Sequence, residues 1–230
     1  MTLADTGAAV ANELAVVRRM TTADARWAAD LHAQALPHGF FARLGPRFLC
    51  SYYETFVASP HAVAYIADST GGPAGVLVGT VRNRLHYSWV IRRRGARLVG
   101  RGLLAMLSRP AVLLLFLRTR LGWYAGGGLR ACKRAFGRAF RSPVAGQSRR
   151  QPAVLLHVAV APDARATGAG TALVSTFVQS AKAAGCAEAV LVTLAGPTGA
   201  GQFYRRLGWT LRDRHDDHDG RLLECYQRRL

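Results

Sequence analysis

The chain has 230 residues, half of them apolar and 19% charged, which is enough apolar material for one packed domain and excludes disorder over most of its length. Its formal net charge of +18 is concentrated, because the range 82–150 holds seventeen of the thirty-one Lys and Arg residues, and no acidic residue lies between Asp68 and Asp163. The remainder is nearly neutral, so the positive charge belongs to one segment and not to the whole surface.

Composition and spacing also exclude several classes of site and segment. The four cysteines have neither finger-like nor paired spacing, so we expect no zinc site and no disulfide framework, and we place the protein in the cytoplasm. The range 1–12 lacks the basic and apolar runs of a signal peptide and is expected to be a mobile tail. The apolar stretch 103–117 is interrupted by Arg109 and Pro110, which leaves it too short to cross a membrane.

The first part of the chain predicts a strand, two helices and a hairpin. A β-like run at 15–18 is followed by Thr and Asp side chains that can cap a helix over 24–36. Apolar residues at helical spacing predict a second helix over 46–57. The β-rich runs 62–67 and 75–81 flank a Gly- and Pro-containing turn, so they predict an antiparallel hairpin.

The last part of the chain alternates strands and helices. The run 154–160 is apolar on both faces, which is typical of a central strand. The elements expected after it are a helix at 168–184, a central strand at 190–193, a short helix at 199–207 and a hairpin of 209–212 with 222–227.

The richest local signal follows the 154–160 strand, where the chain turns through glycines into a helix. Such a turn leaves backbone N–H groups unpaired at the positive end of the helix dipole. Gly168 and Gly170 remove the Cβ atoms that would hold a phosphate away from those donors, and Arg165 can add charge. The spacing R-x-x-G-x-G excludes a P-loop and a dinucleotide fingerprint, so the turn predicts an anion site of another kind.

In the order of its motifs the chain resembles the GNAT superfamily of acyl-CoA-dependent N-acyltransferases. The resemblance rests on the Val17-Arg18 strand followed by Ala23-Asp24, on V-x-P-x-x-R-x-x-G-x-G at 160–170 and on FYRRLGW at 203–209. It covers 15–81 and 153–230 and is stronger in the second part. The fold that it implies is an α/β (α+β) mixed sheet whose two halves, 13–81 and 153–230, are separated by a large basic insertion at 82–152, between the third and fourth strands.

The resemblance also implies the co-substrate, acetyl-CoA, with no metal. The strands near residues 160 and 190 would separate to admit its pantetheine arm. The residues expected to bind acetyl-CoA are Val158, Ala159, Val160, Arg165, Ala166, Thr167, Gly168, Ala169, Gly170 and Thr171. Tyr204 matches the family's usual general acid, which protonates the departing thiolate, and for a free Tyr and a thiol this transfer costs only about 2 kcal/mol. Packing, or contact with the cofactor, is the alternative for Tyr204.

The proton acceptor for the amine departs from the family pattern. Val192 stands where some members carry an acidic base, and Pro197 where many carry an Asn that binds the pantetheine. His157 is the nearest candidate base. Strand alternation nevertheless turns its side chain away from the face shared by positions 154, 156, 158 and 160. A structural histidine and a water relay therefore remain open.

The remaining histidines differ in their expected roles. His38, together with Phe40, lies where GNAT members build the acceptor pocket between their first two helices, so we expect both residues to contact the acceptor. His215 and His218 stand in an acidic turn that resembles a metal site by composition, but a solvated polar turn at a hairpin tip is the better interpretation.

The expected activity is transfer of an acetyl group from acetyl-CoA to the primary amine of a small acceptor by direct attack. Range 82–150 has competing interpretations: a lid over an anionic acceptor such as an amino sugar or nucleotide-linked sugar, a contact with an anionic membrane surface, or a dock for an acidic protein such as an acyl carrier protein. Nucleic acid is disfavoured because no reader motif is present. The alternative to an enzyme is a catalytically idle CoA-binding fold that docks through this segment at the membrane periphery or on an acidic protein.

Overall fold

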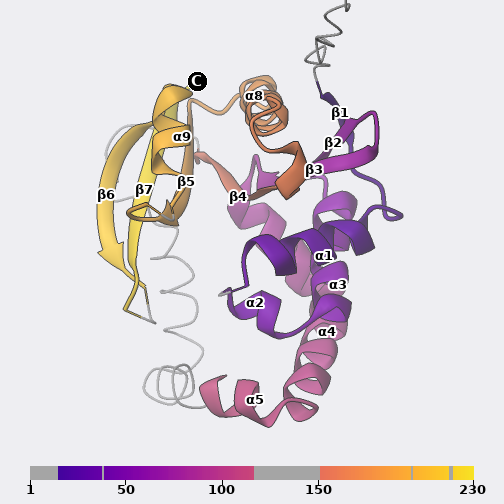
Figure 1. Cartoon of the computed structure of the whole chain (residues 1–230). Helices are drawn as coiled ribbons and strands as arrows, with labels where there is room; N and C mark the ends of the chain where they lie inside the picture. The colour runs from indigo at the N-terminus through magenta and orange to yellow at the C-terminus, as the bar shows by residue number, and fades with distance from the viewer. Residues whose placement is uncertain (1–14, 38, 117–150, 198, 218–219) are drawn as a thin grey trace, which may run out of the picture.

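The computed structural model describes residues 15–37, 39–116, 151–197, 199–217 and 220–230 (Figure 1). Seven strands form one sheet in the order β1-β2-β3-β4-β5-β7-β6. The strands are β1 (Val16–Arg19), β2 (Ala62–Ser69), β3 (Gly72–Thr80), β4 (Ala153–Val160), β5 (Glu188–Leu194), β6 (Thr210–Asp216) and β7 (Leu222–Arg229). Only the β4–β5 pair is parallel, so the sheet is mixed and β4 is central, as the sequence predicts.

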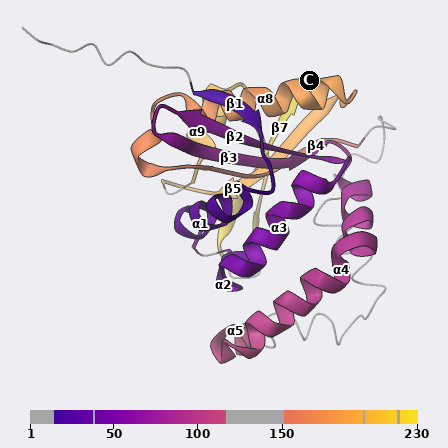
Figure 2. The same ribbon diagram turned by 90° about the vertical axis from the view of Figure 1, so that its right-hand side faces the viewer.

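Helices cover both faces of the sheet, and the two faces hold separate apolar cores. On one face lie α1 (Ala25–Ala35), α2 (Phe40–Arg43) and α3 (Pro46–Ala58), which pack around Leu49, Tyr53 and Ile66. On the other lie α8 (Ala169–Ala183) and α9 (Gly201–Arg206), which pack around Phe177 and Tyr226. Figure 2 shows α8 on the opposite side of the sheet from α1 and α3.

The elements fall close to their predicted positions, with two differences. The short helix α2 is not predicted, because four residues are too few to show a helical period. The expected cap at Asp24 is wrong: its carboxylate makes no side-chain capping bond to α1 and instead accepts two hydrogen bonds from the Arg18 guanidinium, both at 2.8 Å. Arg18 also donates to Asp68 at 2.6 Å, so it joins β1, the start of α1 and β2. This pairing holds the pKa of Asp24 below its usual range.

The chain between β3 and β4 begins as part of the domain core. It forms α4 (Asn83–Leu107) and α5 (Pro110–Phe116), and residues 117–150 lie outside the described ranges. The Thr80 hydroxyl donates to the Asn83 side chain at 3.0 Å where β3 leads into α4. Along α4, His86 is buried and stacks on Phe56 with ring centroids 4.7 Å apart, and Met106 is buried against α3. Of the helices in the described ranges, none has the length and hydropathy needed to cross a bilayer.

Candidate active site

The site begins where β4 and β5 separate. The two strands pair only from Ala153–Leu155 to Ala189–Leu191, although β4 continues to Val160 and β5 to Leu194. A bulge accompanies the separation, because Gly79 pairs with Leu155 and Val78 with His157, which leaves Leu156 as an extra residue in β4. Bulges bend a strand and increase its twist. The edge of β4 beyond Leu155 is therefore open toward β5, which is the splayed sheet that the family resemblance implies (Figure 1).

The open edge of β4 leads directly into a loop of unpaired amides. After Val160 the chain makes a 3-10 turn, Pro162–Ala164, and the Thr167 hydroxyl closes the loop by donating to the Ala164 carbonyl at 2.7 Å. Ala166 and Gly168 have left-handed backbones, with φ of 65° and 91°. Within the described residues, the N–H groups of 166–171 donate to no backbone or side-chain acceptor, because 169–171 form the first turn of α8.

The space over this loop is free for a ligand. A Cβ added at Gly168 would meet no atom within 4 Å, and Arg165 beside it is exposed. Amides at the positive end of a fifteen-residue helix, with a cation next to them, form a cradle suited to a phosphate. The structure thus brings together the loop residues that the sequence nominates for acetyl-CoA binding.

Tyr204 lies on α9, at the mouth of the strand separation. A Cβ at Gly170 would lie 3.4 Å from the Phe203 ring and 3.5 Å from the Val160 side chain, so α9 packs on the end of β4 and the start of α8. The Tyr204 ring is only 6% exposed and packs against Phe203, with ring centroids 5.1 Å apart. Its hydroxyl makes no hydrogen bond to another described residue, and burial raises its pKa to about 12. The hydroxyl is therefore protonated at neutral pH and free to donate.

Comparison with known proteins identifies the family. The sequence model of the acetyltransferase (GNAT) domain matches residues 132–211, which include β4, the amide loop, α8, β5 and α9. Residues 132–211 therefore carry the sequence of a GNAT acetyltransferase domain. The chain is thus a transferase of the kind that moves an acetyl group from acetyl-CoA to an amine.

Solved GNAT structures share the whole fold at low sequence identity. An aminoglycoside 6'-acetyltransferase type Ii is 10% identical, with 93% of this chain and 96% of that chain covered and a TM-score of 0.54. The ribosomal-protein-S18-alanine N-acetyltransferase from Escherichia coli is 12% identical over 93% of this chain and 92% of its own, with a TM-score of 0.52. A GNAT-family acetyltransferase from Streptococcus pneumoniae is 12% identical over 94% and 98%, with a TM-score of 0.52. No curated protein sequence matches the chain.

The turn that carries the GNAT Tyr depends on residues that sequence reasoning missed. A Cβ at Gly199 would overlap the Leu194 carbonyl, so only glycine fits there. The Ala200 N–H, just before α9, donates to the Thr193 hydroxyl on β5 at 3.2 Å. Pro197 stands exposed in this turn. The close backbone approach at Gly199 and the Thr193 hydroxyl, and not a side-chain amide, therefore position α9.

His157 lies on the other face of the sheet, where α1 and α3 pack. Its Nε2 is 3.2 Å from the Tyr52 hydroxyl, and its ring meets the ring of His32 edge-on at 4.7 Å. The predicted alternation is wrong for the first part of β4: Leu156 lies on the same face as His157, whereas Val158 and Val160 lie on the α8 face. The bulge at Leu156 is the reason, because one extra residue reverses the alternation on one side of it.

The environment of His157 makes it a weak base. Burial, and then the neighbouring His32, lowers its pKa to about 3, so the ring stays neutral at physiological pH. A protonated His157 with a pKa of about 3 is a much stronger acid than an ammonium group with a pKa near 10. Proton transfer from the ammonium group to His157 is therefore strongly unfavourable. The hydrogen bond with Tyr52 and the contact with His32 instead favour a role for His157 in holding these two side chains in position.

Aromatic residues of α2 border this cluster. The ring centroids of Phe40 and Phe116 of α5 are 6.1 Å apart, and those of the partly exposed Phe41 and Tyr52 are 5.0 Å apart. His38, which was expected to contact the acceptor, lies outside the described residues. Tyr52 lies in the helix predicted over 46–57, but its contact with His157 was not predicted, because the two residues are 105 positions apart.

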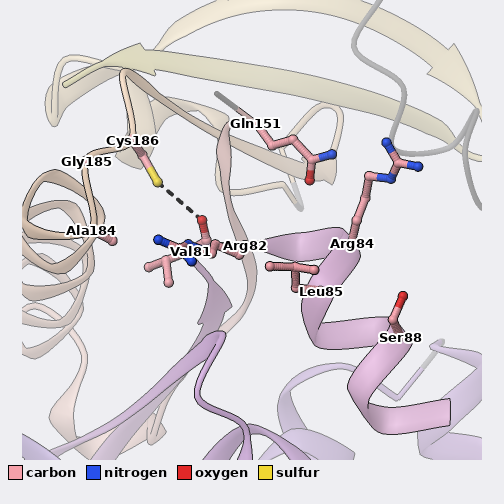
Figure 3. Close-up of a pocket in the computed structure, with 9 residues that line it drawn as sticks. All are labelled: Val81, Arg82, Arg84, Leu85, Ser88, Gln151, Ala184, Gly185 and Cys186. Atoms are coloured by element: carbon pink, nitrogen blue, oxygen red, sulfur yellow. Dashed lines mark hydrogen bonds between the residues drawn. The ribbon is translucent and has the colours of Figure 1, made fainter. Parts of the chain in front are cut away.

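A cavity of about 690 Å³ lies away from this site (Figure 3). It is lined by Val81, Arg82, Arg84, Leu85, Ser88, Gln151, Ala184, Gly185 and Cys186. The Cys186 thiol closes one side by donating to the Val81 carbonyl at 3.3 Å. The cavity lies at the start of β4 and the amide loop follows the end of β4. Because the strand has eight residues, the cavity and the loop are roughly 25 Å apart. The cavity is therefore no part of the GNAT site.

Proposed function

We propose that the chain transfers an acetyl group from acetyl-CoA to the primary amine of a small, anionic acceptor. The observation that carries the proposal is the open edge of β4 beyond Leu155, which leads through the turn Pro162–Ala164 into the amide loop 166–171. The pantetheine arm would pair with the backbone of Val158–Val160 like an added strand, and the pyrophosphate would accept hydrogen bonds from the loop amides beside Arg165. The donor site then uses backbone groups almost alone.

The reaction needs one acid and one proton acceptor. The amine nitrogen attacks the thioester carbonyl, a C–N bond forms, and the C–S bond breaks as the sulfur leaves with its electron pair. Tyr204 donates its hydroxyl proton to that thiolate. With a Tyr pKa of about 12, the transfer to a free thiol of pKa near 8.5 costs about 5 kcal/mol. A thiolate in the same buried site is also desolvated, which raises its pKa and reduces the difference. The amine attacks in its neutral form. Water relays the proton that its nitrogen then loses to the solvent, from which Tyr204 regains its own proton.

The acceptor side combines aromatic rings with positive charge. Phe41, backed by the buried Tyr52, offers a wall on which a small ring can pack, and His157 lies behind Tyr52. Arg43 on α2 and Arg47 on α3 are exposed, two residues after Phe41 and five residues before Tyr52. Guanidinium groups bind phosphates and carboxylates through paired hydrogen bonds. This chemistry favours an acceptor that carries an anionic group, such as an amino sugar phosphate or a nucleotide-linked amino sugar.

Release of free thiol from acetyl-CoA tests the proposal. The purified protein is incubated with acetyl-CoA and, separately, with amino sugar phosphates, nucleotide-linked amino sugars, neutral amino sugars, aminoglycosides and short peptides. We expect turnover with an anionic amine, and we expect the pair Arg43→Gln and Arg47→Gln to raise KM for it about tenfold while KM for its neutral analogue is unchanged. Arg229→Gln, on the far end of β7, is the matched control.

Three results would contradict parts of the proposal in different ways. Absence of acetyl-CoA binding by calorimetry would contradict the donor site. Tight acetyl-CoA binding without turnover of any amine would indicate an idle fold. Turnover restricted to cationic or neutral amines would agree with the proposed donor site but would contradict the proposal that the acceptor is anionic.

A further inference from the structure

The outer face of α4 exposes apolar side chains that a soluble helix normally buries. It is defined here by Val99, Leu103, Leu104 and Leu107, which are 52–72% exposed. Their spacing of three and four residues places them on one stripe. The opposite side of the same helix packs on α3, where Gly102 and Met106 are buried. The stripe therefore remains available after α4 has made its contacts with α3.

Positive charge surrounds the outer face of α4. Arg92 and Arg93 are exposed, and the helical period places them on the same side as the leucines, about three turns closer to the start of α4. Arg97 pairs with Glu54 of α3 at 3.4 Å and borders the stripe. Helices α4 and α5 contain no acidic residue, because none occurs between Asp68 and Asp163. The face thus combines an apolar stripe with the exposed cations Arg92 and Arg93.

We propose that the outer face of α4 docks on the surface of an anionic lipid bilayer. The leucines would lie at the level of the upper acyl chains, and the arginines would contact headgroup phosphates, as in other helices that lie in the interface plane. Figure 2 shows α4 at the edge of the described part of the molecule, on the far side of α3 from α1.

Charge complementarity distinguishes the bilayer from other occupants. A second copy of the chain would place Arg92 and Arg93 against the same arginines, or leave them without a partner. A nucleic acid would use the arginines and leave the leucine stripe in water. A surface that is anionic outside and apolar beneath satisfies both features. Docking uses the side of α4 opposite α3, so it leaves the aromatic wall at Phe41 and Tyr52 accessible.

Vesicle sedimentation tests this inference with the full chain. We expect the protein to sediment with vesicles of phosphatidylcholine containing 30% phosphatidylglycerol, and to bind pure phosphatidylcholine at least tenfold more weakly. Binding should fall at least tenfold in 1 M NaCl, because salt screens the arginines. The double variant Leu103→Ser, Leu107→Ser should bind at least thirtyfold more weakly, since both side chains lose their apolar contact with lipid. Its circular dichroism and melting temperature should stay close to wild type, because both positions are exposed.

The control variant is Leu222→Ser, which removes a leucine of similar exposure from β7 and should bind vesicles like the wild type. Wild-type vesicle binding by the Leu103, Leu107 variant would overturn the inference. Absence of binding to anionic vesicles would overturn it too, and indicate that another part of the chain covers the face. A dimer in solution that the double variant dissociates, without vesicle binding, would assign the face to a second copy. Each result is independent of acetyl transfer, because none of the readouts uses activity.

Discussion

Mild acid should destabilise the fold, because three histidines around α1, α3 and α4 are held neutral. Burial lowers the pKa of His32 to about 4, that of His86 to about 4 and that of His157 to about 3. His32 and His86 are only 2% and 1% exposed. In the unfolded chain each imidazole has a pKa near 6.5. The unfolded state therefore binds more protons below that pH, and stability falls as the pH decreases.

The size of the effect follows from linkage. At pH 5.5 an imidazole of pKa 6.5 gains about 1.4 kcal/mol from protonation, and at pH 7.5 only about 0.1 kcal/mol. Because the folded-state pKa values lie well below 5.5, the native state gains almost nothing over this interval. Each histidine thus removes about 1.3 kcal/mol and the three together about 4 kcal/mol, a large part of the 5–15 kcal/mol typical of a domain. The contact between His32 and His157 does not change this figure, since both are neutral throughout.

Urea unfolding at pH 7.5, 6.5 and 5.5, monitored by circular dichroism and fluorescence, measures the loss in free energy of unfolding. The carboxylate of Asp24 has a lowered pKa and contributes stability that is lost only as the pH falls below about 4, so it does not enter this window. The variant His86→Phe keeps a ring stacked on Phe56 and should lose about 1.3 kcal/mol less than wild type between pH 7.5 and 5.5. Phe177→Leu, on the α8 face, should lower stability equally at both pH values.

Two outcomes would refute the reasoning. A wild-type loss below about 2 kcal/mol between pH 7.5 and 5.5 would mean that even His32 and His86 together are not held neutral by the fold. An unchanged pH dependence in His86→Phe would show that the proton is taken up elsewhere.

Three further changes test the site and the fold. Tyr204→Phe should lower kcat about ten- to a thousandfold with acetyl-CoA affinity unchanged, measured by single-turnover kinetics and calorimetry; a wild-type rate would leave Tyr204 a packing role. Gly168→Val should abolish acetyl-CoA binding while the fold persists by circular dichroism, because the side chain fills the phosphate cradle and strains a left-handed backbone; undiminished calorimetric affinity would exclude the amide loop as the pyrophosphate site. Asp24→Asn should lower the free energy of unfolding at pH 7 by about 1–2 kcal/mol, since Arg18 loses a charged partner; a loss below about 0.3 kcal/mol in urea unfolding would mean that solvent replaces the pair.

The sequence alone was sufficient for the features that depend on near neighbours. The alternation of strands and helices, the central place of β4 and the turn with Gly168 all follow from periodicity, apolar runs and glycine within a few residues. The amide loop belongs to this class, because a strand, a turn and a helix start are contiguous in the chain. Its residues were therefore predicted together, and they lie together.

The tertiary structure decided everything that depends on what packs against what. The bulge at Leu156 falls where β4 stays paired with β3 and separates from β5, and no pattern within β4 encodes that register. Two contacts join residues far apart in the chain: that of His157 with Tyr52, and that of His86, from the expected insertion, with Phe56. Sequence spacing sets which side chains share one face of an element, but the distance between elements is set by the packing of the whole core.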